Sequence, residues 1–446
     1  MDEYLTLILF GGFLVMLILG APITVSLAGA SMAAYMILDK NPIALVQIAF
    51  TSVGNFPLMA LPAFVLAGAL MEAAGISKRL VDIAESLAGP VTGGLGAATV
   101  IACLFFGAIS GSGPATTAAV GMLMIPAMVK RNYDKSYASA VTAASGGLGI
   151  IIPPSIPIVI FGISAMGLRP PPEAIAQYGV FASVSIPKLF IAGVIPGLLM
   201  ALTLIVTNYI IAKRKGYKGL TETWSLSEVR QSLCKGIWSL LAPLLILGGI
   251  YSGMFTPTES AIVAIFYSLF VGIFIHRELA FKSVMKSLTT TTWITGRVLL
   301  ILFAATVFGR LLIEQQIPVV VAESLLSFTN NMYLVWAITI GLLLFIGMFM
   351  ETLAAIMIIV PVLLPIMYML GADPTHVGIV IVCVLSIGFA TPPLGENIFV
   401  ASGIGGSTVE QITAKIHPFV LASIIGVFLI AFFPQITLWL PSVMGY

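Results

Sequence analysis

Residues 106–117 read Phe106-Gly107-Ala108-Ile109-Ser110-Gly111-Ser112-Gly113-Pro114-Ala115-Thr116-Thr117, at the end of an apolar stretch. Three glycines and a proline so close together do not hold an uninterrupted α-helix. The segment therefore predicts two half-helices joined by an unwound tip. Such a tip frees backbone carbonyl oxygens, and Ser110 and Ser112 add hydroxyl groups beside them.

The composition of the chain is that of an integral membrane protein. Hydrophobic residues make up 59% of the 446 positions and charged residues 9%, whereas a soluble domain carries about 25% charged residues. A spanning helix needs roughly 20 apolar residues, so the chain has room for about a dozen spans. We predict an all-α polytopic membrane protein. The net charge of +2 gives no indication of a nucleic-acid partner, and the sequence lacks the G-x-x-x-x-G-K-[ST] motif of a P-loop ATPase.

Three further segments combine helix-breaking residues with polar ones, at 146–157, 347–352 and 388–397. Unwound backbone at membrane depth is tolerated where protein buries it or where it lines a wet cavity. Freed carbonyls and hydroxyls suit a small cation such as sodium, and half-helix N-termini offer N–H groups to a carboxylate. The alternative interpretation is that these glycines act only as hinges or close-packing positions.

The breaks recur in the same order in both halves of the chain. Pro392-Pro393 follows Pro153-Pro154 by 239 positions, and the same offset relates Gly388 to Gly149. Proline and glycine are common in transmembrane helices generally, which is the alternative explanation. A true repeat whose halves each cross the membrane an odd number of times has inverted topology, as in many secondary transporters.

A polar stretch at 213–235, rich in Lys and Arg, separates the two halves. Excess positive charge favours the cytoplasmic side of a membrane. We therefore predict a first inverted repeat at 1–212, a cytoplasmic linker at 213–235 and a second inverted repeat at 236–446. Each repeat is expected to hold scaffold helices, a hairpin and a broken helix.

Four polar side chains near these breaks are candidates for function. Glu351 lies in an apolar run, where an ionisable group is costly and is by default a functional candidate; a structural carboxylate paired with a helix end is the alternative. Arg310 could meet a substrate carboxylate or snorkel from a helix end. Glu396 and Asn397 follow the fourth break and could cap a half-helix or contact substrate.

Together these motifs resemble the large membrane subunit (the M, or DctM-like, subunit) of tripartite ATP-independent periplasmic (TRAP) transporters. The resemblance covers nearly the whole chain and is carried by 106–112, Pro126, 130–134, 152–157, 192–197 and 255–259. It implies an ion-transporter-like fold with an inverted repeat, two re-entrant hairpins and broken helices. It also implies an elevator mechanism, in which a mobile transport domain moves against a fixed scaffold.

The resemblance assigns roles to individual positions. It implies sodium as the coupling ion and no other cofactor. The first cation site would use Ser110, Ser112, Gly149, Ile152 and Pro154, and the second Thr352 or its neighbours with Gly388, Thr391 and Leu394. The substrate residues would be Ser155, Arg310, Glu351 and Asn397. Two departures are Gly113-Pro114, where the family more often has a second serine, and an apparent insertion at 168–185.

By this resemblance the chain is the translocating subunit of a sodium-driven, binding-protein-dependent importer of a small organic acid, such as a dicarboxylate, a sialic acid or another carboxylate. Its expected partners are a separate small four-helix membrane subunit and a periplasmic binding protein. We expect it to cross the bacterial inner membrane several times. We do not expect it to be an enzyme. The alternative function is a single-component anion transporter of related fold. A channel fits less well, because paired broken helices suit alternating access.

Overall fold

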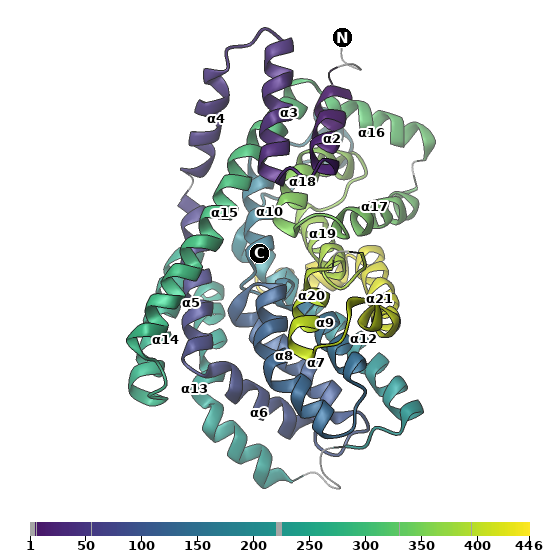
Figure 1. Ribbon diagram of the computed structural model, residues 1–446. Helices are drawn as coiled ribbons and strands as arrows, with labels where there is room; N and C mark the ends of the chain where they lie inside the picture. Colours follow the sequence, from purple (N-terminus) through teal and green to yellow (C-terminus); the bar gives the residue numbers. More distant parts are fainter. Residues whose placement is uncertain (1–4, 6, 55, 220–224, 330, 394) are drawn as a thin grey trace.

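The computed structural model describes residues 5, 7–54, 56–219, 225–329, 331–393 and 395–446 (Figure 1). All regular elements in these ranges are helical, which confirms the predicted all-α class.

Six helices are long and apolar enough to cross a membrane. They are α12 (Ile186–Lys215), α13 (Leu226–Tyr251), α14 (Pro257–Phe270) with the π-helical turn Val271–Ile275, α15 (Phe281–Glu314), α18 (Thr352–Met369) and α21 (Val409–Phe432). A seventh span is formed if α5 (Ala60–Ala73) and α6 (Ile76–Ala88), which bend by 70°, count as one. Composition leaves room for about a dozen spans, and within the described residues six helices, or seven with the bent pair, meet this criterion of length and composition.

The remaining helices do not meet this criterion of length and hydropathy. They are α2 (Gly12–Ile18), α3 (Ile23–Ile37), α4 (Ile43–Val53), α7 (Gly94–Ser110), α8 (Gly113–Lys130), α9 (Lys135–Gly146), α10 (Ile156–Met166), α11 (Pro172–Tyr178), α16 (Ile317–Phe328), α17 (Met332–Gly347), α19 (Pro374–Gly388), α20 (Glu396–Gly405) and α22 (Gln435–Val443). Glycine and proline divide this sequence, so many half-helices take the place of full spans.

The helix boundaries follow the sequence repeat. The first residues of α8 and α18 are 239 positions apart, and both helices have 18 residues. The same offset relates the first residues of α9 and α19. An elbow also recurs, because Gly75 between α5 and α6 and Gln316 between α15 and α16 both have positive φ, at 71° and 54°. The repeat thus extends beyond the breaks to the helices that lead into them.

The predicted linker at 213–235 is helical at both ends. Helix α12 continues to Lys215, and α13 begins at Leu226 after a cap from Ser225. Residues 220–224 lie outside the described ranges. The helical ends mean that the connection between α12 and α13 is shorter than the polar stretch.

The helices form two groups. An outer group consists of α3, α4, α5, α13, α14 and α15, in which α5 and α15 pack together. A central group contains α7 to α10, α12 and α18 to α21. Figure 1 shows α4, α5, α14 and α15 along the left of the view, beside the central group. The groups meet where α15 packs on α18 and α5 packs on α7, and this contact places the breaks next to the outer group.

Candidate functional site

The first tip joins α7 to α8 through Gly111 and Ser112. Helix α7 ends at Ser110 because Gly111 adopts a left-handed conformation with φ 61°. The Ser112 hydroxyl then caps α8 by accepting a hydrogen bond from the Ala115 N–H at 3.5 Å. Ser110 Oγ lies 2.8 Å from Thr116 Oγ1, and Thr116 Oγ1 donates to the Ser112 carbonyl at 2.7 Å. The tip therefore gathers three oxygens at one point.

The first tip packs directly on the break after α9. A Cβ added at Gly149 would lie 2.6 Å from the Ser112 carbonyl oxygen, and one added at Gly107 would lie 2.9 Å from Gly149 Cα. A Cβ at Gly111 would lie 2.9 Å from the Pro154 carbonyl oxygen. Glycine is needed at these positions because a larger residue would separate the two segments.

Four of the five residues predicted for a first cation site are therefore neighbours: Ser110, Ser112, Gly149 and Pro154. The fifth, Ile152, is buried in the same break, and its side chain packs toward Gly197. Thr116 belongs to the same group although sequence reasoning did not select it. The sequence feature that could have identified Thr116 is its hydroxyl side chain, which lies one helical turn after Ser112.

The second tip repeats this arrangement between α17 and α18. A Cβ at Gly388, the last residue of α19, would lie 2.6 Å from the Gly347 carbonyl oxygen. Thr352 is the buried first residue of α18. Thr391 Oγ1 donates to the Ile387 carbonyl at 2.7 Å. The structure brings the tip at Gly347 against the break at Gly388, and the predicted ligand Leu394 lies outside the described residues.

A cavity of about 380 Å³ lies between the tips and the outer group. Both tips line it, and α5 and α15 close its other side. Its polar lining includes Glu72, Ser110, Ser112, Thr290, Arg297, Glu351, Thr352 and Glu396. An ion pair joins the two sides of this cavity, because Arg297 Nη2 from α15 lies 2.9 Å from Glu351 Oε1.

The two partners of this ion pair differ in exposure. The Arg297 side chain is 64% exposed, whereas that of Glu351 is 17% exposed. Sequence reasoning selected Glu351 and missed Arg297. The rule that found Glu351 applies equally to Arg297, an ionisable residue in the interior of the long apolar helix α15.

Known proteins are similar to this chain over most of its length. Residues 10–436 match the family described as "Tripartite ATP-independent periplasmic transporter, DctM component". The chain belongs to the DctM family. Its relatives are transporter permeases, which are not enzymes.

Two similar relatives illustrate the family. The isethionate TRAP transporter permease DctMQ of Oleidesulfovibrio alaskensis is 40% identical over 97% of this chain, which spans 66% of that longer protein. The C4-dicarboxylate large permease DctM of Rhodobacter capsulatus is 34% identical over 98% of this chain and 99% of its own length. Among solved structures, the YdaH transporter of Alcanivorax borkumensis has a TM-score of 0.60 at 15% identity, with 88% of each chain covered. The two proteins therefore have similar folds although their sequences differ widely.

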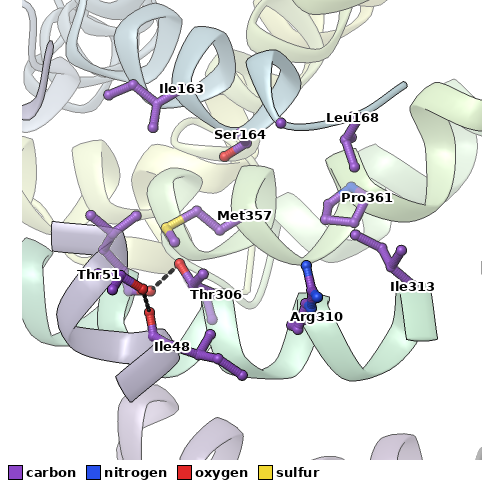
Figure 2. A pocket seen from close by; sticks show the side chains of 14 residues that line it. Ile48, Thr51, Ile163, Ser164, Leu168, Thr306, Arg310, Ile313, Met357 and Pro361 are labelled. Carbon is purple, nitrogen blue, oxygen red and sulfur yellow. Dashed lines mark hydrogen bonds between the residues drawn. The ribbon is translucent and has the colours of Figure 1, made fainter. Parts of the chain in front are cut away.

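Arg310 of this DctM chain lies apart from the tips. It lines a second cavity, of about 520 Å³, together with Thr51, Thr306, Met357 and other residues (Figure 2). Arg310 Nε pairs with Glu314 at 2.9 Å, and Glu314 pairs with Lys40 at 2.7 Å. The structure thus brings Arg310 to a different cavity from Glu351.

Ser155 and Asn397 lie behind the cavity of this DctM chain. Ser155 is buried, caps α10 through the Ile158 N–H at 3.3 Å and donates to the Ile150 carbonyl at 2.5 Å. Asn397 is also buried, and its Nδ2 donates to the Ala143 carbonyl at 3.0 Å. Among the described residues, its Oδ1 has no hydrogen-bond partner. The Asn397 contact connects α20 to α9, whereas the Ser155 contacts hold the break before α10 together.

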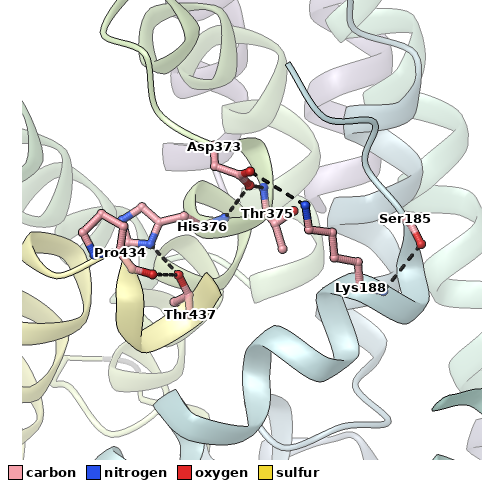
Figure 3. Close-up of polar contacts among 7 residues, drawn as sticks. All are labelled: Ser185, Lys188, Asp373, Thr375, His376, Pro434 and Thr437. Carbon is pink, nitrogen blue, oxygen red and sulfur yellow. Dashed lines mark hydrogen bonds and ion pairs between the residues drawn. The ribbon is translucent and has the colours of Figure 1, made fainter. Parts of the chain in front are cut away.

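A polar network anchors the start of α19 in this DctM chain (Figure 3). Asp373 caps α19 by accepting from the Thr375 N–H at 2.7 Å, and Lys188 Nζ of α12 lies 3.8 Å from Asp373. His376 Nδ1 lies 2.8 Å from Thr437 Oγ1 of α22, and its Nε2 lies 3.2 Å from the Ala431 carbonyl. The network holds α19, and with it the break at Gly388, against the C-terminal helices. Within the described ranges, no group of three or more His, Cys, Asp or Glu could hold a metal.

Proposed function

We propose that this chain is the translocating subunit of a sodium-driven transporter that imports a small organic acid across the bacterial inner membrane. The observation that carries the proposal is the Arg297–Glu351 pair inside the cavity that both tips line. A guanidinium is the side chain best suited to bind a carboxylate in two-pronged geometry. Because Arg297 is largely exposed to the cavity, an incoming anion can replace Glu351 as its partner.

The oxygen cluster at the first tip supports sodium coupling. Ser110, Thr116 and the Ser112 carbonyl lie within one small volume against Gly149. Unwound carbonyls of this kind coordinate sodium in transporters with discontinuous helices. A cation there would hold the tip against the break, which links cation binding to the shape of the substrate cavity.

The division into two helix groups supports an elevator mechanism. The cavity lies at the contact between the groups, so sliding the central group would carry both tips and a bound substrate together. The elbows at Gly75 and Gln316 supply bends where the outer helices lead toward that group. In this proposal the outer group is the scaffold and the central group is the transport domain.

The proposed partners follow from the family, whose description is of a tripartite transporter. A periplasmic binding protein would deliver the substrate, and a separate small four-helix membrane subunit would pair with this chain. The relatives in this family are named for isethionate and for C4-dicarboxylates. A small organic anion is the substrate chemistry that the cavity and these relatives share.

The test is uptake of radiolabelled organic acids into proteoliposomes that contain the chain, its small membrane partner and the cognate binding protein. We expect uptake only with an inward sodium gradient and with the binding protein present. Uptake by this chain alone, or uptake indifferent to sodium, would instead establish the single-component transporter. A potassium gradient of equal size is the matched control.

A further inference from the structure

The charged groups that line the substrate cavity are mostly acidic. Among its described lining residues, Arg297 is the one cation, whereas Glu72, Glu351 and Glu396 are three carboxylates. Lys286 attracts Glu72 but does not line the cavity. Arg297 also attracts Glu396, which Glu351 repels. The direct contact of the guanidinium is with Glu351, at 2.9 Å.

The helix N-termini at the cavity offer little further capacity for anions. Ser112 and Ser155 occupy the N-termini of α8 and α10 by accepting hydrogen bonds from their backbone N–H groups. Pro114 and Pro157 in the first turns of these helices have no N–H to donate. Each of these helix ends therefore has fewer free N–H groups to offer an anion than an uncapped helix would have.

The other two half-helices begin with carboxylates. Glu351 is the N-cap residue of α18, and Glu396 is the first residue of α20. A negative side chain at a helix N-terminus is stabilised by the helix dipole. These resident carboxylates add negative charge beside the positive helix ends that a second anionic group of a substrate would need.

From this balance of charge we infer that the substrate carries a single anionic group together with hydroxyl or amine donors. The anionic group would bind Arg297, and Glu351, released from Arg297, would join Glu396 in accepting hydrogen bonds from the donors. A C4-dicarboxylate would place its second carboxylate near Glu396 or Glu72, where like charges repel. This inference rests on the proposed function and narrows its substrate class to hydroxylated or amino mono-acids, including sulfonates.

The test measures ligand-induced thermal stabilisation of the full chain, purified together with its small membrane subunit, in nanodiscs with sodium. The single-anion probes are isethionate and a sialic acid, and the dicarboxylate probes are succinate and malate. We expect the single-anion compounds to bind about tenfold or more tightly. Equal or tighter binding of succinate or malate would overturn the inference and leave the proposed function intact, whereas no sodium-dependent binding of any acid would overturn both.

A variant tests whether Glu396 is the residue that excludes dicarboxylates. Glu396→Gln should allow succinate to bind, because it removes one charge that repels the second carboxylate. The preference for single-anion compounds over dicarboxylates should fall by about tenfold. Glu410→Gln is the matched control, because Glu410 lies in the first turn of α21 outside the cavity. An unchanged preference in Glu396→Gln would contradict the assignment. So would an equal loss of sodium dependence for both classes, since the carboxylate would then serve the cations.

Discussion

Arg297 and Glu351 are 54 positions apart in the chain, and their side chains meet at 2.9 Å across the cavity. The pair joins α15 of the outer group to the N-terminus of α18 in the central group. An exposed ion pair adds little stability, about 0–1 kcal/mol. Its position inside the cavity is therefore consistent with the substrate-binding role that we propose for it.

Arg297→Gln should raise the KM for uptake by about tenfold or more, because a hydrogen bond to a charged group contributes about 1.5–3 kcal/mol. The Tm of the purified chain should change little. Arg310→Gln is the matched control, since Arg310 lines the other cavity. A larger effect of Arg310→Gln on KM would show that the substrate uses that second cavity.

Glu351→Gln should lower both the KM and the maximal rate of uptake. Without the carboxylate, Arg297 loses its partner in the empty cavity, so the anion binds more tightly and leaves more slowly. Initial rates over a range of substrate concentrations measure both parameters. Full activity with an unchanged KM would rule out an essential charge at Glu351.

Ser112→Ala should raise the sodium concentration needed for half-maximal uptake. It removes the hydroxyl that caps α8, worth about 1 kcal/mol, from the residue whose carbonyl belongs to the oxygen cluster at the first tip. Ser185→Ala is the matched control, because Ser185 caps α12 in the same way at 3.5 Å from the Lys188 N–H, far along the chain from the tips. If both variants change sodium dependence equally, the effect belongs to the cap and not to a cation site.

Gly149→Ala should abolish sodium-dependent uptake and lower the Tm. The new methyl group would meet the Ser112 carbonyl at 2.6 Å and push the tip away from the break. Gly341→Ala in α17 is the control, because a Cβ there meets nothing within 4 Å. In that helix the substitution should slightly stabilise the chain. A Gly149→Ala protein with normal uptake would show that the tip need not touch the break.

Asn397→Ala should lower stability by about 1–3 kcal/mol, since it leaves the Ala143 carbonyl buried without its donor. The protein that remains folded should keep its KM, because Asn397 lies behind the cavity. Thermal unfolding together with uptake per folded molecule separates the two effects. A raised KM with an unchanged Tm would show instead that Asn397 contributes to substrate binding.

The breaks could be predicted from sequence because glycine and proline act locally. All four appear within a few residues of the expected positions, and their offset of 239 recurs in the helix boundaries. Partners across helices could not be predicted in this way. Arg297 and Arg310 lie in one helix, 13 residues apart, which at about 100° per residue places them roughly 140° apart around its axis. Which of them faces the tips depends on how α15 rotates against α18, and this is set by packing.

The division of the apolar sequence into helices was also hard to predict, because it too depends on packing. Composition measures how much apolar sequence the chain contains, but not how that sequence is divided. Sequence around Gly111 and Gly149 looks as apolar as a full span, yet it folds as half-helices that pair with each other. The cost of unwinding is met by tertiary contacts, which a linear pattern does not show.

The mixing of the two halves within the central group has a consequence for any fragment of the chain. Ser112 comes from the first half and Glu351 from the second, and α8 and α9 pack on α20. Neither half therefore supplies the whole central group. Two fragments divided between α12 and α13 would each lack part of the cavity lining, and expressing them together tests whether the halves assemble without a covalent connection.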